Sequence, residues 1–346
     1  MKNQHFIIRA FVIELLYISY IVCEVYHIIP SLDSSCYAQQ SCLTLNELLP
    51  ELLKKNTTLW FLPGNHRLTL HLHVSDVNVF CMLSETNNTW IIYDNLASIS
   101  FTNVDEIRID NLKFTGQGIS DSKPRGPAAA ISIHQCASAV INNAIFGHLN
   151  RKLIDVNHTS TVSIYKSVFV SNTASNDSNL VHVTGSAISI HQSELSFNVA
   201  NKGAILGLFN SLTNITESNI TCNWAYNGVL HSRNGEVNID TIWFGNNTYN
   251  IYTETTSYRA SNSNNVSGDA QIDALIQSFN SSVTLLRNNI TCNRGNTGVL
   301  WANRSNIVSV QLVFYTTHTR EGVYLYKQAI LQSITLKLQT IPMGTM

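Results

Sequence analysis

The eight residues Val162-Ser-Ile-Tyr-Lys-Ser-Val-Phe169 decide the fold. Apolar residues stand seven and five places before the closing Phe and alternate with polar ones, which is the period of a β-strand and not of a helix. The same arrangement recurs as Ile107-Arg-Ile-Asp-Asn-Leu-Lys-Phe114 and as Val237-Asn-Ile-Asp-Thr-Ile-Trp-Phe244. The sequence therefore predicts short strands that repeat along the chain.

A second apolar signal opens each segment about fifteen residues before its closing residue. The predicted openers are Ile99, Ile131, Ile154, Val181, Ile205, Leu230, Leu275, Leu300 and Tyr324. The predicted closers are Phe114, Phe146, Phe169, Phe197, Cys222, Phe244, Cys292, Phe314 and Leu338. Most steps between openers are 23 to 27 residues, and a repeat of that length is typical of a solenoid. No coil leaves room for a helix, so we expect two or three strands per coil.

Asparagine and glycine supply the expected corners. Asn tolerates left-handed backbone angles and bonds to neighbouring backbone, so a stack of Asn corners should form a ladder. The expected ladder residues are Asn198, Asn223, Asn246 and Asn293. Glycine suits the sharp corner before an opener. The expected corner glycines are Gly203, Gly228, Gly298 and Gly322.

Two steps between openers are longer than the rest, at 32 and 45 residues. The first accommodates a loop at 116–127, and the second a polar insertion at 249–268. Upstream, the leucines of 44–55 predict one short helix, which Pro50 limits, followed by a strand and a Pro63-Gly64 turn. We expect an all-β protein: a small N-terminal cap and first strands at 27–95, then nine or ten coils at 96–346.

The N-terminal residues differ from the rest. Lys2 and Arg9 precede an apolar run from Phe11 to Cys23 that only Glu14 interrupts, which is typical of a secretory signal peptide over 1–26. An N-terminal membrane anchor or a buried strand is the alternative. No later stretch reaches the roughly 18 apolar residues that a membrane span requires. We therefore expect a secreted or extracellular-surface protein with no transmembrane span in the mature chain.

Asn-x-Ser/Thr sequons agree with a secretory route. Eleven occur, at Asn56, Asn87, Asn157, Asn176, Asn214, Asn219, Asn246, Asn265, Asn280, Asn289 and Asn303. Asn219 and Asn289 each precede an inward-facing Ile, so strand alternation should place both outside, where a glycan can attach.

The cysteines fit an oxidising compartment. Cys36 and Cys42 stand close together in a small polar segment, and we expect a local disulfide there. Cys222 and Cys292 lie at least two coils apart, roughly 10 Å or more, which is too far for a bridge. We expect them to be buried thiols in the Phe column. The sequence assigns no partner to two further cysteines, Cys81 and Cys136.

Together these features resemble a right-handed parallel β-helix of the pectin-lyase-like superfamily, and in particular extracellular β-helix proteins of sponges and other simple animals. The resemblance rests on three features. They are the Cys36-x5-Cys42-Leu-Thr-Leu segment, the stretch Thr58-Leu-Trp-Phe-Leu-Pro-Gly-Asn-His66, and Ile-x-Ile-x4-Phe coils with Asn corners. It implies adhesive or recognition roles.

Enzymes of the resembled class cleave acidic polysaccharides with several carboxylates, or with Arg and Ca²⁺-binding Asp, on one strand face. Hydrolysis requires two carboxylates across the scissile bond. Here Asp155 and His182 are the candidate catalytic pair, because alternation places them outward on adjacent coils. One acid alone occupies that predicted face, and a glycan on neighbouring Asn157 would obstruct a groove. We therefore interpret these residues as a solvated strand face and expect no catalysis.

The histidines and tryptophans are the candidate residues for metal, cofactor and sugar sites. His66, His71 and His73 are close in sequence, but no Cys or acid at ligand spacing joins them, so we expect no metal and no cofactor. The tryptophans can stack on sugar rings, although packing against corners or the cap is the favoured interpretation. They are Trp60, Trp90, Trp224, Trp243 and Trp301.

Charge narrows the choice of partner. Charged residues are 12% of the chain, the formal net charge is -1, and no basic stripe is present, so nucleic acid is excluded. We expect a non-catalytic extracellular structural, adhesion or recognition protein with a glycan or protein ligand. Two alternatives stay open: a polysaccharide lyase or hydrolase, active or degenerate, and a fragment of a larger cell-surface β-helix protein.

Overall fold

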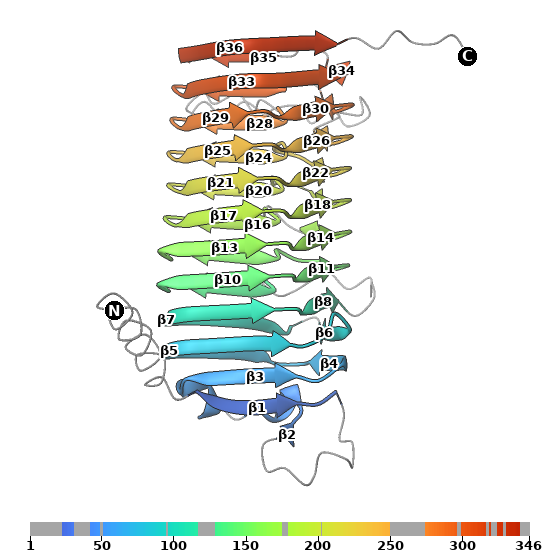
Figure 1. Cartoon of the computed structure of the whole chain (residues 1–346), viewed down its shortest axis with the longest axis vertical. Coiled ribbons are helices and arrows are strands. Elements are labelled where there is room, and N and C mark those ends of the chain that lie inside the picture. Colours follow the sequence, from blue (N-terminus) through green and yellow to red (C-terminus); the bar gives the residue numbers. More distant parts are fainter. Residues whose placement is uncertain are drawn as a thin grey trace, which may run out of the picture.

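The computed structural model is a column of stacked coils built from parallel strands (Figure 1). It describes residues 23–30, 42–48, 51–94, 96–116, 129–174, 179–201, 203–249, 274–295, 299–315, 318–319, 324–327 and 330–339. Side chains beyond residue 310 are outside the description. All the strand pairs are parallel, and each strand pairs with the equivalent strand of the next coil. The fold is the expected all-β, right-handed parallel β-helix.

Three sides of the column carry the long strand ladders. Face 1 consists of β9 (Ile131–His134), β12 (Ile154–Asn157), β16 (Val181–Thr184), β20 (Leu206–Phe209), β24 (Leu230–Arg233), β28 (Ile276–Phe279), β32 (Leu300–Asn303) and β35 (Tyr324–Lys327). Face 2 consists of β1 (Glu24–Ile28), β3 (Thr57–Phe61), β10 (Ser138–Asn142), β13 (Thr161–Tyr165), β17 (Ala187–His191), β21 (Leu212–Thr216), β25 (Glu236–Asp240) and β29 (Ser282–Leu286). Two long strands, β5 (His71–Ser84) and β7 (Ser98–Asp110), run through both faces at the N-terminal end.

Face 3 consists of β4 (Gly64–Leu68), β6 (Thr89–Tyr93), β8 (Lys113–Gly116), β11 (Ile145–Gly147), β14 (Val168–Val170), β18 (Glu194–Ser196), β22 (Asn219–Thr221), β26 (Trp243–Gly245) and β30 (Asn289–Thr291). At the C-terminal end, β33 (Asn306–Tyr315) and β36 (Ile330–Gln339) span faces 2 and 3. A separate narrow sheet follows face 3. Its strands are β15 (Thr173–Ala174), β19 (Val199–Ala200), β23 (Trp224–Ala225), β27 (Thr248–Tyr249), β31 (Arg294–Gly295) and β34 (His318–Thr319).

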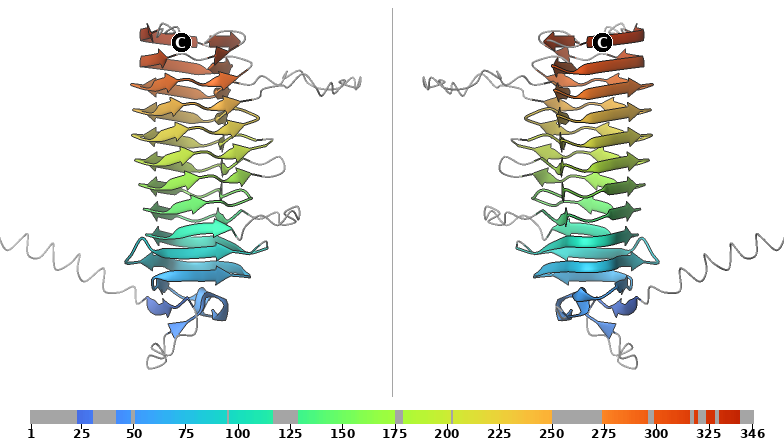
Figure 2. Two further views of the ribbon diagram at one scale, coloured as in Figure 1. Left: turned by 90° about the vertical axis from the view of Figure 1, so that its right-hand side faces the viewer. Right: turned by 90° about the vertical axis from the view of Figure 1, so that its left-hand side faces the viewer.

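The number of coils differs slightly from the expectation. Within the described residues, face 1 contains eight separate strands, from β9 to β35, and thus about eight regular turns instead of nine or ten. The earlier levels are built by the long strands β5 and β7, which turn from one face to the next without a break (Figure 2).

The N-terminal cap contains two 3-10 turns where one short helix was predicted. They are η2 (Leu45–Glu47) and η3 (Leu52–Lys54), and β2 (Cys42–Leu43) precedes them and pairs with β1. Thr44 and Glu47 cap η2, since the Thr44 N–H donates to Glu47 Oε2 at 2.8 Å. Pro50, which cannot continue a helical hydrogen-bond ladder, stands between the two turns and outside the described residues.

The interior contains stacked apolar columns, and part of the predicted closing column is wrong. Phe114, Phe146 and Phe169 stack as expected, with ring centroids 4.8 and 4.9 Å apart. The column then continues through residues two places before three of the predicted closers. Leu195, Ile220 and Ile290 fill it, with Phe244 between the last two.

The three mispredicted closers, Phe197, Cys222 and Cys292, instead turn a corner at φ of 55°, 54° and 51°. Phe197 is 60% exposed, Cys222 is half-buried and Cys292 is exposed. The prediction of buried thiols is therefore wrong. The prediction failed because the apolar residues two places earlier also fit the strand pattern, and they are the ones that point inward before the strand ends. These residues are Leu195, Ile220 and Ile290.

Two predicted openers are wrong by one residue. Strand pairing aligns Val181 with Leu206 and Leu230 with Ile276, where Ile205 and Leu275 were predicted. All four candidate residues are apolar and buried, so composition does not separate them. With the openers displaced by one residue, the sequence pattern does not identify two outward-facing phenylalanines, Phe209 and Phe279.

A buried asparagine ladder stabilises the corner after face 3. Its members are Asn172, Asn198, Asn223, Asn247 and Asn293, all at most 1% exposed. Each Oδ1 in the stacked positions accepts from the backbone N–H and Nδ2 of the Asn one coil earlier, at 3.0 to 3.1 Å. The ladder is present as predicted, but Asn247 and not Asn246 belongs to it; Asn246 is an exposed corner at φ 54°.

Among the expected corner glycines, Gly228 has φ +80°, and a Cβ there would lie 2.0 Å from the Ala274 carbonyl oxygen. Gly203 is buried and follows Lys202, which is outside the described residues, as are Gly298 and Gly322.

Other predicted segments lie partly outside the described residues. The loop at 116–127 begins at Gly116, the last residue of β8, and the rest is not described. The insertion at 249–268 begins one residue too early, because Tyr249 is a fully buried strand residue of β27. Residues 1–22 and Cys36 are not described, and neither is the Cys42 side chain, so the signal peptide and the Cys36–Cys42 disulfide stay predictions. β1 begins at Glu24, within the interval assigned to the signal peptide.

The Asn ladder generates a stability prediction. Asn198→Ala removes the Nδ2 bond to the Phe169 carbonyl and leaves the buried Asn172 N–H without its acceptor. Because unsatisfied buried polar groups are costly, we expect the free energy of unfolding to fall by about 2 to 4 kcal/mol in urea titrations. Asn65→Ala, at an exposed position of β4, is the control and should change it by less than about 0.5 kcal/mol. Equal effects of the two substitutions would contradict a stabilising ladder.

Candidate functional site

The outward side of face 1 displays two straight rows of side chains, because successive strand residues point to opposite sides and the coils are in register. Row one contains His73, Ser100, Ser132, Asp155, His182, Gly207, His231, Gln277 and Trp301. Row two contains Ser75, Thr102, His134, Asn157, Thr184, Phe209, Arg233, Phe279 and Asn303.

Asp155 and His182 are neighbours in row one, as strand alternation predicts, since β12 and β16 pair these two residues. Asp155 is engaged by a cation from its own coil: the Lys152 Nζ lies 3.2 Å from Asp155 Oδ2. The carboxylate therefore has a local partner other than the imidazole.

Both ring nitrogens of His182 are hydrogen-bonded. The Ala204 N–H donates to Asn179 Oδ1 at 2.8 Å, which fixes the orientation of that amide. Asn179 Nδ2 then donates to His182 Nδ1 at 3.1 Å, so the ring proton is on Nε2, which donates to Thr184 Oγ1 at 3.1 Å. This network holds the imidazole neutral.

The surroundings of His182 also favour the neutral form of the imidazole. Burial lowers the pKa of His182, the charge of Lys152 lowers it further, and Asp155 opposes both. Gly207 makes the network possible, because a Cβ at that position would lie only 1.9 Å from Asn179 Nδ2. The pair is thus held by structural hydrogen bonds and an ion pair.

Five rings form a continuous line over the C-terminal half of face 1, which we call the aromatic strip. It consists of His182, Phe209, His231, Phe279 and Trp301, with successive centroids 5.1, 5.6, 5.6 and 4.4 Å apart. The rings alternate between the two rows, one per coil. With coils about 4.8 Å apart, the strip is roughly 19 Å long.

The strip is partly open and has a polar neighbour. Phe209 and Phe279 are half-buried, while Trp301 is 4% exposed. Gln277 lies between His231 and Trp301 in row one, is also 4% exposed, and its Nε2 has no hydrogen-bond partner. Buried amides normally have partners, and this unpaired donor atom is itself shielded from solvent.

The sequence analysis placed His182 outward but missed Phe209 and Phe279. Each Phe is the fourth residue of its face-1 strand, Leu206–Phe209 and Ile276–Phe279. These are the two coils whose openers were displaced by one residue. If Leu206 and Ile276 are aligned with the first residues of the neighbouring face-1 strands, both rings are predicted to face outward.

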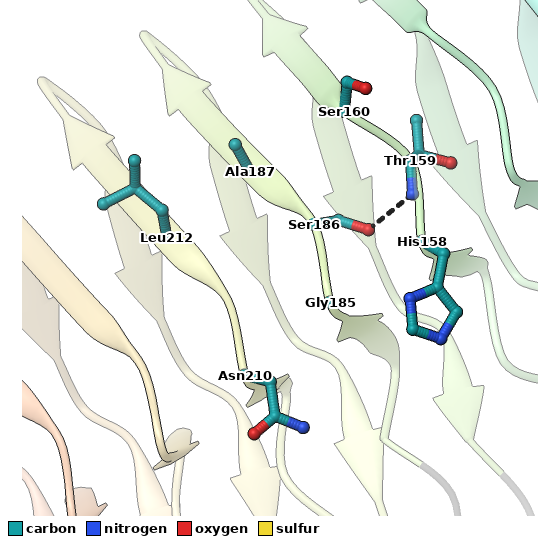
Figure 3. A pocket seen from close by; sticks show the side chains of 8 residues that line it. All are labelled: His158, Thr159, Ser160, Gly185, Ser186, Ala187, Asn210 and Leu212. Atoms are coloured by element: carbon teal, nitrogen blue, oxygen red, sulfur yellow. Dashed lines mark hydrogen bonds between the residues drawn. The ribbon is translucent and has the colours of Figure 1, made fainter.

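A shallow hollow of about 380 Å³ lies at the corner between faces 1 and 2 (Figure 3). Its corner residues are His158, Gly185 and Asn210, at φ 50°, 59° and 50°. Ala187 at the middle coil is small, and Leu212 and Ser160 flank it, so the surface recedes there. Row two is adjacent, because Thr184 and Phe209 directly precede Gly185 and Asn210. The sequence analysis did not predict this hollow.

The remaining histidines do not converge. His71 and His73 stack at 6.0 Å and bond to Ser98 and Ser100, at 2.5 and 2.7 Å. His66 instead points inward from face 3 and bonds to the Leu62 carbonyl. Among the residues with described positions, no group of three His, Cys, Asp or Glu side chains can hold a metal ion.

The other tryptophans lie on other parts of the column. Trp243 is 43% exposed on face 3, Trp90 contacts Lys113 with its Nζ 4.9 Å from the ring centre, and Trp60 and Trp224 are half-buried. Trp301 is therefore the one tryptophan that belongs to the strip.

The predicted glycan sites vary in exposure. Asn219 and Asn289 are exposed on face 3, as alternation predicts, and Asn87, Asn214, Asn246 and Asn280 are exposed as well. Asn56, Asn157 and Asn303 are half-buried, and Asn176 and Asn265 lie outside the described residues. Glycosylation of these residues stays a prediction.

The strand pairing defines the fold class of the chain, a right-handed parallel β-helix. No protein-family model matches the sequence, and no curated protein matches it. Among solved structures, the catalytic domain of a GH87 alpha-1,3-glucanase in complex with nigerose is similar over 90% of this chain and 68% of its own, at 9% identity and TM-score 0.42. The A-module of the Azotobacter vinelandii mannuronan C-5 epimerase AlgE6 is similar over 81% and 91%, at 8% identity and TM-score 0.23. Likeness at these values gives no information on activity.

In the described part of the chain, no helix has the length and apolar character that crossing a membrane requires.

His231 provides a pH prediction. Burial, aided by Arg233, lowers the pKa of His231 from 6.5 to about 4, and Gly207, Gln277, Phe209 and Phe279 are its other neighbours. The unfolded chain therefore binds a proton at a higher pH than the folded chain does. Stability should fall as the pH decreases from about 6.5 to 4, by about 2 kcal/mol at pH 5.

Urea unfolding at pH 7 and pH 5 measures this effect. His231→Gln should remove about 2 kcal/mol of the pH dependence. His134→Gln, in row two of the same face, is the matched control and should leave the wild-type dependence in place. Unchanged dependence in His231→Gln would contradict the burial of a neutral imidazole.

Proposed function

We propose that the chain is a non-catalytic extracellular recognition protein that binds a glycan along face 1. The observation that carries this proposal is the aromatic strip, in which five rings on successive coils form one line on the outside of a rigid sheet. Side chains on such a scaffold hold fixed positions without prior ordering, which lowers the cost of binding.

The geometry of the strip suits a polymer of sugars. The C–H face of a pyranose packs on an aromatic ring, much as nucleic-acid bases stack on aromatic side chains in single-strand binding grooves. An extended strip of roughly 19 Å contacts several successive sugars, whereas a small ligand would require an enclosed pocket.

Charge favours an uncharged or weakly charged glycan. Arg233 is the one formal charge in the rows beside the strip itself, within the described side chains, and Asp155 at its N-terminal end is paired with Lys152. The histidines of the strip are neutral, because burial lowers the pKa values of His182 and His231. Contact with the ligand therefore depends on ring stacking and hydrogen bonds.

The state of Asp155 and His182 supports binding without cleavage. A lyase or hydrolase requires a free base or a pair of carboxylates positioned across the bond. Here the carboxylate is bound to Lys152, and both His182 nitrogens are occupied by Asn179 and Thr184. Within the described rows of face 1, Asp155 is the single carboxylate.

The extracellular part of the proposal is supported by the sequons. Six of the eleven have an exposed Asn at a strand surface or corner, where a glycan can attach. Secretion into a glycosylating compartment is consistent with these positions.

The test is a glycan array probed with the full chain secreted from eukaryotic cells, followed by affinity measurements on the glycans retained. Phe279→Ala and Phe209→Ala should each weaken binding about 10-fold, since stacking of one ring contributes roughly 1 to 3 kcal/mol. Phe197→Ala, which removes an exposed ring at a corner beyond face 3, is the matched control and should bind like the wild type.

Melting curves confirm that each variant is folded. Two outcomes would overturn the proposal. In one, no glycan is retained by the wild type. In the other, binding is unchanged in both strip variants and falls in Phe197→Ala, which would place the site on another face.

A further inference from the structure

The closest internal repeat flanks a single exposed tryptophan. Ser218-Asn-Ile-Thr-Cys-Asn223 and Asn288-Asn-Ile-Thr-Cys-Asn293 contain the same sequon, on β22 and β30 of face 3. The strand between them is β26, and its pairing places Trp243 directly opposite Asn219 on one side and Asn289 on the other. The three outward side chains thus occupy one row on consecutive coils.

The orientation of the indole is fixed by two contacts. The Trp243 Nε1–H donates to Thr291 Oγ1 at 2.7 Å, and Thr291 is the hydroxyl residue of the Asn289 sequon. The ring lies over Gly245, where an added Cβ would meet it at 2.8 Å. One side of the ring therefore packs on backbone, and Trp243 remains 43% exposed.

We propose that Trp243 is the packing platform for the first N-acetylglucosamine of an N-linked glycan on Asn289. The proposal rests on the secretory location within the proposed function, and it is independent of ligand binding by face 1. Strands of neighbouring coils are about 4.8 Å apart, so the sugar on Asn289 is within reach of the indole.

Asn289 is favoured over Asn219 because the indole is bonded toward the Asn289 coil. The side-chain hydrogen bond to Thr291 holds the ring beside this sequon. Toward the coil of Asn219, the Trp243 backbone N–H donates to the Ser218 carbonyl at 3.2 Å, and this bond does not orient the ring. Packing of the apolar sugar face on the ring removes exposed aromatic surface from water. It also covers a large apolar side chain that would otherwise favour self-association.

The test is a double-mutant cycle on the protein secreted from eukaryotic cells. Wild type, Asn289→Gln, Trp243→Ala and the double variant are compared by melting temperature, and mass spectrometry of the peptide measures occupancy of Asn289. We expect Asn289→Gln to lower the melting temperature by about 2 °C when Trp243 is present and to have no effect in Trp243→Ala. Trimming the glycan to its first sugar should preserve the wild-type value.

Asn214→Gln is the matched control. Asn214 is an exposed sequon on β21 whose neighbours in the row are Ser189 and Asn238, so its effect should be the same with and without Trp243. The same four proteins made without glycosylation should show additive effects of the Asn289 and Trp243 substitutions.

Four outcomes would overturn the inference. They are an unoccupied Asn289, equal effects of Asn289→Gln in both backgrounds, coupling that persists without glycans, and coupling to Asn219→Gln in place of Asn289→Gln. Failure of face 1 to bind glycans leaves this cycle unchanged, so the two proposals fail separately.

Discussion

The register between successive coils is the constraint on which the rest of the structure depends. Each strand pairs with its equivalent one coil away, so an inward residue always stacks on an inward residue. A buried ladder fixes this register at one corner, because the first four of its five amides donate both to the next Asn and to a carbonyl oxygen. Its members are Asn172, Asn198, Asn223, Asn247 and Asn293. A shift of one residue would bury the outward rows.

Register also determines which outward side chains lie together on one surface. Once the inward columns are filled, every second strand residue joins a straight row on the outside, and chemistry that is dispersed in the sequence is brought together. The rings of His182 and Trp301 are separated by more than a hundred residues, yet they belong to one strip. The same rule places Trp243 between two sequons on face 3. The two faces thus display different side chains on one repeating backbone.

Strand period and repeat length predict the fold, because apolar alternation is a direct consequence of burial on one side of a sheet. The exact register is harder to predict. Leu195 competes with Phe197, Leu206 with Ile205, and Asn247 with Asn246, and in each pair both residues fit the pattern. Only the partner one coil away decides, and that partner is known from the structure.

The difficulty of predicting register also limited the prediction of the candidate site. Asp155 and His182 were correctly expected to be adjacent, but the roles of Lys152, Asn179 and Gly207 depend on side-chain positions that no spacing rule gives. Phe209 and Phe279 were missed because their coils had been aligned one residue too early. The strip is therefore defined by the strand pairing and not by the sequence spacing.

The proposed function is that face 1 binds a glycan without cleaving it. The most direct measurement incubates the secreted protein with a polysaccharide that it retains, and then determines the polymer length and the number of new chain ends. We expect stable binding of the polysaccharide with unchanged polymer length. Shortening of the polymer that is abolished in Asp155→Ala, with folding preserved, would contradict it.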